Sequence, residues 1–193
     1  MEFAIIAPAF FALLLAILYT ATIFLAQQML QTAAQSAARL LLTGAAQTAK
    51  MSNGTIGMTA TDFKNAICNG ATVTNASGQS VTIPPMLPVL LSCSRLTVNV
   101  STATTYNVKS TAAPTFTYSN SGAITSTNTG YSTNSGGNGQ SVIIVLQLIY
   151  LWPTGIGPLG LNLVNQPNSN RMLIATSLLT TESYSCNAAQ TSC

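Results

Sequence analysis

The sequence lacks histidine and has very few charged residues. It holds six Lys or Arg and three Asp or Glu in 193 residues, so charged residues make up 5% of the chain, against roughly 25% in ordinary globular domains. Without imidazole, neither a Ser-His-Asp triad nor a histidine proton shuttle can form. Outside the N-terminal segment the carboxylates are Asp62, which we interpret as a helix cap, and Glu182, which we interpret as solvated. We therefore predict no enzymatic activity and no cofactor.

The basic residues and the cysteines exclude two further kinds of site. The six basic residues stand singly, with no patch that could neutralise a row of phosphates, so we predict no nucleic-acid partner. The four cysteines form no C-x-x-C pair, which argues against a metal site. Their even number indicates two disulfides and an oxidising compartment. Of three possible connectivities we choose Cys68–Cys93, clamping a short helix to the next strand, and Cys186–Cys193, closing a small C-terminal loop.

The N-terminal segment is a long uncharged apolar run. From Phe3 to Ala26 it spans about 24 residues, roughly 36 Å as a helix, which exceeds the roughly 30 Å of a bilayer's hydrocarbon core. It is longer than the apolar core of a secretory signal and lacks a basic region before it. Gln27, Gln31 and Gln35 then continue a helical period. We predict a single helix over residues 1–50, a membrane span in its first half.

Such a helix requires other helices around it. It is apolar in its first half and rich in alanine in its second, and small residues permit close approach of helix backbones. These features favour a helix that polymerises with copies of itself. The alternative is a single-pass anchor that holds one domain at a membrane.

The apolar run also carries a family resemblance. The stretch "EFAIIAPAFFALLLAILY", leading into "AQQMLQTAAQSAARLLLTGAAQ", resembles the N-terminal region of TadE-like proteins, pilin-like components of Tad-type pilus systems in the type IV pilus superfamily. The resemblance implies a precursor in the bacterial inner membrane, a prepilin peptidase, pilus assembly machinery and a homo-oligomeric filament at the cell surface. In that superfamily an acid usually lies slightly further into the mature chain, after a basic leader ending in glycine. Either the sequence starts short of that terminus, or Met1 is the terminus.

The resemblance also implies a role for the N-terminal acid. In the superfamily this glutamate is buried among helices, with the terminal amine of a neighbouring subunit as its partner, and Glu2 matches that position. An acid that is costly in hydrocarbon then sets the register between subunits. The subunit contacts that we expect on this helix are Glu2, Phe3, Ala4, Ala7, Phe10, Phe11, Leu14, Ile17 and Leu18.

Residues 51–193 have a different composition, rich in Ser, Thr, Asn and Gly, and we predict a separate β-rich domain there. A short helix is expected over 61–68, with Thr61 as its cap. Runs of β-branched and aromatic residues predict strands at 80–85, 95–100, 105–108, 115–118, 141–152 and 171–183, the last two as partners. The polar stretch 119–141 is typical of a flexible or glycan-bearing surface loop. We expect this domain to hold its own core, so that a chain truncated to about Ala33 stays folded.

Together these features predict an α+β, pilin-like fold, with a long N-terminal hydrophobic helix and an antiparallel sheet packed on its upper part. The favoured function is a structural subunit of an extracellular type IV-like filament. Two alternatives share its local features: a low-copy component that primes or tips such a pilus, and a membrane-anchored binding module or adhesin.

Overall fold

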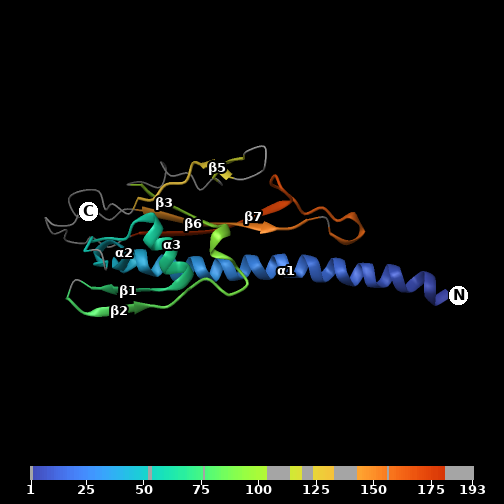
Figure 1. Cartoon of the computed structure of the whole chain (residues 1–193), viewed down its shortest axis with the longest axis horizontal. Coiled ribbons are helices and arrows are strands. Elements are labelled where there is room, and N and C mark those ends of the chain that lie inside the picture. The colour runs from blue at the N-terminus through green and yellow to red at the C-terminus, as the bar shows by residue number, and fades with distance from the viewer. Residues whose placement is uncertain are drawn as a thin grey trace.

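The structure is a computed structural model that describes residues 2–51, 54–75, 77–103, 114–118, 124–132, 143–155 and 157–180. A long N-terminal helix is followed by antiparallel sheets (Figure 1), so the predicted α+β class is confirmed. The helices and strands are α1 Glu2–Leu42, α2 Ala45–Thr48, α3 Ala60–Asn69, β1 Ala71–Thr74, β2 Ser80–Ile83, η1 Cys93–Arg95, β3 Leu96–Ala103, β4 Phe116–Tyr118, β5 Ile124–Thr127, β6 Ile143–Pro153, η3 Pro158–Gly160 and β7 Asn170–Thr180.

Helix α1 is shorter than predicted. It has 41 residues and continues through Pro8, which gives a length of about 60 Å. It ends at Leu42 because Gly44 adopts a left-handed conformation, with φ 70°, which glycine reaches without a steric penalty. The short helix α2 follows at once. The prediction of one helix of about fifty residues is therefore wrong at its C-terminal end.

The main sheet has the strand order β3-β6-β7, and both pairs are antiparallel. The predicted pairing of the two long apolar runs is confirmed, since β6 and β7 pair from Ile143↔Thr180 to Pro153↔Asn170. Strand β6 lies in the centre, and its side chains from 143 to 151 are all buried. Because side chains alternate along a strand, its even-numbered residues point into the core shared with α1.

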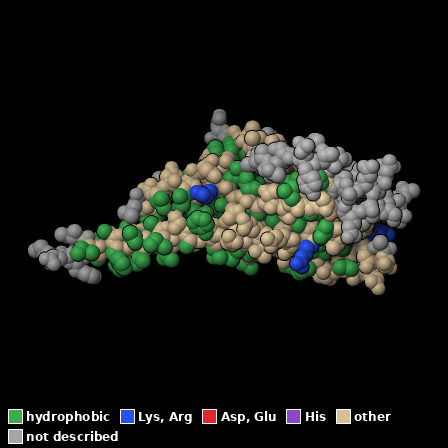
Figure 2. Space-filling view, turned by 180° about the vertical axis from the view of Figure 1, so that it is seen from behind, with side chains coloured by type: hydrophobic (Ala, Val, Ile, Leu, Met, Phe, Trp, Pro, Cys, Tyr) green, Lys and Arg blue, Asp and Glu red, His purple; other side chains and the backbone are tan. Residues whose placement is uncertain are grey.

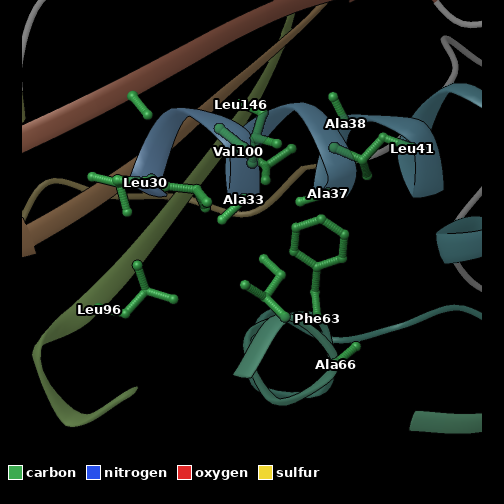
Figure 3. Close-up of a cluster of buried hydrophobic side chains, with 14 of the residues drawn as sticks. Leu30, Ala33, Ala37, Ala38, Leu41, Phe63, Ala66, Leu96, Val100 and Leu146 are labelled. Carbon is green, nitrogen blue, oxygen red and sulfur yellow. The ribbon is translucent and has the colours of Figure 1, made fainter. Parts of the chain in front are cut away.

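The core lies between α1, the sheet and α3. On α1, Leu30, Ala37 and Leu41 are fully buried; Figure 3 shows them with Phe63 of α3 on one side and Leu146 of β6 on another. The alanines on this face of α1 let the helix approach both neighbours closely. At about 1.5–3 kcal/mol for each large apolar side chain, burial of these residues is the main force that holds α1 to the sheet.

The core includes more of α1 than the sequence indicated. Ile23 is 5% exposed and Ala26 is fully buried, and both belong to the same cluster as Leu30 and Ala33. A chain truncated to about Ala33 would lose all of these contacts. The core of the domain is therefore shared with α1 on both sides of Ala33, and the folding of a chain truncated to about Ala33 stays a prediction.

Helix α3 begins with a capping box. Its N-cap is Thr59, whose hydroxyl accepts from the Asp62 backbone N–H, while the Asp62 carboxylate accepts from the Thr59 N–H at 3.1 Å. Thr61, the expected cap, lies inside the first turn instead. The interpretation of Asp62 as a capping residue is confirmed.

The predicted disulfide between Cys68 and Cys93 is present, with a Cα–Cα distance of 5.7 Å. It joins the last turn of α3 to η1, immediately before β3. The backbone N–H groups of Met86 and Leu87 both donate to Ile67 O at 2.9 Å, so two links hold α3 to the following chain. Cys186 and Cys193 lie outside the described residues.

Two small hairpins complete the described fold. Strands β1 and β2 pair antiparallel, as do β4 and β5. Of the predicted strands, 80–85 and 115–118 correspond to β2 and β4, and 105–108 lies outside the described residues. The sequence did not predict β1. Nor did it predict β5, which lies within the stretch 119–141. In the same stretch, Tyr131 forms an isolated β-bridge with Val100 of β3.

Candidate assembly and membrane surface

The N-terminal half of α1 is the most unusual surface of the molecule. It projects beyond the β-domain and is covered with hydrophobic side chains in Figure 2. Phe11 is 60% exposed and Leu18 is 61% exposed, whereas large side chains of this kind are normally buried. The exposed large apolar residues of this half are Ile6, Phe10, Phe11, Leu13, Leu14, Leu15, Ile17, Leu18, Phe24 and Leu25.

This exposed half has the properties of a membrane span. Within the described residues, the helix from Ile6 to Leu42 is long and apolar enough to cross a bilayer, and little of its most apolar stretch is buried in the protein. A core helix of a soluble protein would pass the same length test but would bury that stretch. The helix and its composition are therefore compatible with a membrane-anchored precursor.

The predicted subunit contacts fall within this half. Residues 7, 10, 11, 14, 17 and 18 follow a spacing of three and four, so they share one broad face of the helix. Leu13 and Leu15, on other faces, are also more than half exposed. The exposure alone therefore selects no single contact face. Glu2, Phe3 and Ala4 lie in the first turn of α1, and their side chains are not among those described.

The β-domain contacts α1 at Tyr19. The Tyr19 hydroxyl donates to Thr154 O at 2.8 Å, in the loop that joins β6 to β7. Gly157, in the same loop, packs so closely that a Cβ there would lie 2.9 Å from the Tyr19 ring and 2.8 Å from Leu161 O. Only glycine fits this position. Sequence reasoning did not identify this contact, because Tyr19 lies in a uniformly apolar run and Thr154 is distant in the sequence.

A groove of about 290 Å³ lies one to two helical turns further along α1, between the helix and the start of β7. Arg171 donates from Nη1 to Leu163 O at 3.1 Å on its wall, so the groove is apolar with a cation at one side. Its lining residues are Thr20, Ile23, Phe24, Gln27, Leu163, Arg171, Met172 and Leu173.

The described residues offer little for catalysis. Asp62 is engaged in the α3 cap, and Glu182 lies outside the described ranges. Among the residues described there is no group of three or more His, Cys, Asp or Glu that could hold a metal ion. Burial, with a smaller contribution from the Asp62 charge, raises the pKa of Tyr131 above its ordinary value of 10.0. Tyr131 packs on Phe63 with ring centroids 5.7 Å apart, which is a core contact.

Comparison with known proteins gives one match. Residues 1–39 match the family model described as TadE-like protein, which confirms the resemblance drawn from the N-terminal motifs. No curated protein and no solved structure matches the chain. The family match covers the exposed half of α1 and most of its buried half, and it does not extend into the β-rich part of the chain.

Proposed function

We propose that this protein is a structural subunit of an extracellular Tad-type pilus filament, polymerising through α1. The observation that carries the proposal is the division of a single continuous helix. From Ile23 onward one face of the helix is built into the domain core, while the large apolar side chains before Ile23 are exposed. When the protein is inserted in the inner membrane, the exposed N-terminal half contacts lipid; in the filament, it contacts the same half of neighbouring subunits.

The composition of the exposed half supports packing between helices rather than anchoring alone. Ala7, Ala12 and Ala16 interrupt the large side chains, and small residues allow close backbone approach without a hydrophobic driving force. Phe10, Phe11, Leu14, Ile17 and Leu18 then supply the contact area. An anchor needs only apolar length and gains nothing from these small residues.

In this proposal, Glu2 sets the alignment of α1 with the helices of neighbouring subunits. A carboxylate near the end of an apolar helix is costly in hydrocarbon, and a cation on the next subunit offsets that cost only in the correct alignment. The partner that the family resemblance implies is the terminal amine of a neighbouring chain. The pilus machinery and a prepilin peptidase are the further partners that follow from the same resemblance.

Glu2→Leu tests the proposal. Replacing the acid improves insertion into the membrane, but it leaves a neighbour's cation without a partner, at a cost of several kcal/mol. The amount of filament in sheared surface material, divided by the amount of subunit in the membrane fraction, should therefore fall strongly. Thr22→Leu, at an exposed polar position on the same helix, is the matched control and should leave this ratio unchanged.

Negative-stain microscopy with antibodies to the domain separates the alternatives. A structural subunit is labelled along the length of shed filaments, whereas a low-copy component is labelled at their tips or is rare. A plain anchor stays in the membrane fraction and extracts with detergent as a monomer. If Glu2→Leu subunits polymerise as wild type does, the register role is wrong and Glu2 is only an interfacial residue.

A further inference from the structure

The exposed apolar surface of α1 continues past the point where the β-domain begins. Phe24 is 72% exposed and Leu25 is 49% exposed, and both lie one to two helical turns beyond Tyr19. A bilayer that covers this apolar surface therefore also reaches the part of the β-domain that lies beside Tyr19. The β6–β7 loop, residues 154–169, is bonded to α1 at Tyr19. In Figure 1 this loop is the part of the β-domain that extends furthest along α1 toward the N-terminus.

The composition of the β6–β7 loop suits that depth. Residues 154–169 contain no charged side chain and include Leu161, Leu163 and Val164, which are all partly exposed. Two aromatic residues with polar atoms flank the loop, Tyr19 on α1 and Trp152 at the end of β6. Tyr and Trp concentrate where the hydrocarbon of a membrane meets its headgroups.

Two arginines lie at the same end of the sheet. Arg171 pairs with Trp152 in the β6–β7 register and lines the groove beside Thr20. Arg95 donates from Nη1 to Leu151 O and to Asn170 Oδ1, both at 3.3 Å. Since these bonds use one nitrogen of each guanidinium, further donors remain on both side chains.

We propose that, when α1 spans the membrane, the β6–β7 loop and Tyr19 enter the headgroup region of the bilayer, where Arg95 and Arg171 bind phosphates of anionic lipids. The inference rests on the membrane-inserted state proposed above. Guanidinium groups bind phosphate oxygens through paired, charge-assisted hydrogen bonds. The lipid that surrounds α1 thus occupies the groove and contacts the loop surface. These contacts fix the position of the β-domain relative to the bilayer.

The single tryptophan of the chain makes the depth of the loop measurable. In a Trp152→Phe background, Leu161→Trp or Val164→Trp places the probe in the loop. Ser77→Trp, in the β1–β2 turn at the opposite end of the domain (Figure 1), is the control. The full chain is reconstituted in phosphatidylcholine and phosphatidylglycerol vesicles that carry bromine on the upper acyl chain. We expect the loop probes to be quenched several-fold more strongly than the control.

The outcomes separate this inference from the proposed function. If the protein floats with the vesicles and the loop probes are quenched no more than the Ser77→Trp control, the inference is overturned and the membrane span stands. If the protein does not float with the vesicles, both fail. Blue-shifted emission of the loop probes without quenching by bromine assigns the loop to a second copy of the chain, which also overturns the inference.

The preference for anionic lipid is tested by native mass spectrometry of the detergent-extracted full chain, with phosphatidylglycerol and phosphatidylcholine competing for the protein. Arg95→Gln with Arg171→Gln should lower the retained phosphatidylglycerol several-fold, and Lys at both positions should restore much of it. Arg39→Gln with Lys64→Gln removes the same charge elsewhere and should have little effect. An equal loss of phosphatidylglycerol in both double variants would mean that only the net charge matters. That result would overturn the assignment of Arg95 and Arg171 as the lipid-binding residues.

Discussion

Gln27 and Ile174 join α1 to the sheet through a hydrogen bond of 2.8 Å from the glutamine Nε2 to the isoleucine carbonyl. The carbonyl belongs to β7, which lies at the edge of the described three-stranded sheet, so the side chain satisfies a group that no strand reaches. Gln27→Ala should lower the free energy of unfolding by about 0.5–1.5 kcal/mol. The measurement is urea unfolding of the full chain in detergent, followed by circular dichroism.

Gln28 provides the control for that change. It is the next residue on α1 and is exposed, so Gln28→Ala should change the stability by less than about 0.5 kcal/mol. Equal effects at the two positions would mean that the bond to Ile174 contributes nothing beyond helix propensity.

The two halves of α1 should respond differently to the same substitution. Leu30 is fully buried, whereas Leu18 is 61% exposed. Leu30→Ala leaves a cavity in the core and should cost about 2–5 kcal/mol of stability. Leu18→Ala should leave the unfolding transition of the domain nearly unchanged. A large loss of stability on Leu18→Ala would show that the boundary between the halves lies closer to the N-terminus than Ile23.

Loss of the Cys68–Cys93 disulfide should destabilise the fold. The bond closes a loop with a sequence separation of 25 residues, so Cys68→Ser with Cys93→Ser should cost on the order of 3 kcal/mol, mainly by releasing the unfolded chain. Comparison of the unfolding midpoints of wild type and the double variant measures the cost. Peptide mapping without reduction checks the connectivity, and a Cys68–Cys186 peptide would contradict it.

Tyr131 should make the protein sensitive to alkaline pH. Burial raises its pKa in the folded state above 10.0, while the unfolded chain titrates near 10. Above pH 10 the unfolded chain therefore loses a proton that the folded chain keeps. The contribution to stability is fully present below pH 10 and falls as the pH rises toward the folded-state pKa. Tyr131→Phe should reduce this alkaline slope.

At neutral pH, Tyr131→Phe should be neutral or stabilising, because the Tyr131 hydroxyl is buried and has no hydrogen-bond partner in the described part of the chain. Tyr150→Phe is the matched control. The Tyr150 hydroxyl accepts from the Ser92 N–H at 3.0 Å, so its removal should cost about 0.5–1.5 kcal/mol. Equal losses would indicate that Tyr131 has a partner outside the described residues.

Strong periodic and compositional signals predicted most of the large elements. The apolar runs of α1, β6 and β7 were identified because length and β-branched content distinguish a helix from a strand there. The α3 cap was misplaced by two residues, although Thr59 and Asp62 have the spacing of a capping box. Gly44 likewise marked the end of α1. Strands β1 and β5 are short and polar, and their pairing depends on contacts that no local pattern records.

The sequence could not predict which apolar residues of α1 are exposed and which are buried in the core. A leucine that faces lipid, a second subunit or a β-sheet has the same apolar character, so Leu18 and Leu30 are indistinguishable as sequence. Tertiary packing alone separates them. The Tyr19 contact was missed for the same reason, since its partner Thr154 is 135 residues away.

Helix α1 has no glycine between Glu2 and Leu42, and the same rod that is free at one end is embedded in the core at the other. It therefore has no joint between the two halves. A pull on the β-domain is transmitted along the backbone to the first turn, and sliding one helix past another by a single residue lifts the attached domain by about 1.5 Å and rotates it by about 100°. In any polymer built on α1, the axial rise between subunits therefore also determines the orientation of the β-domains on the polymer surface.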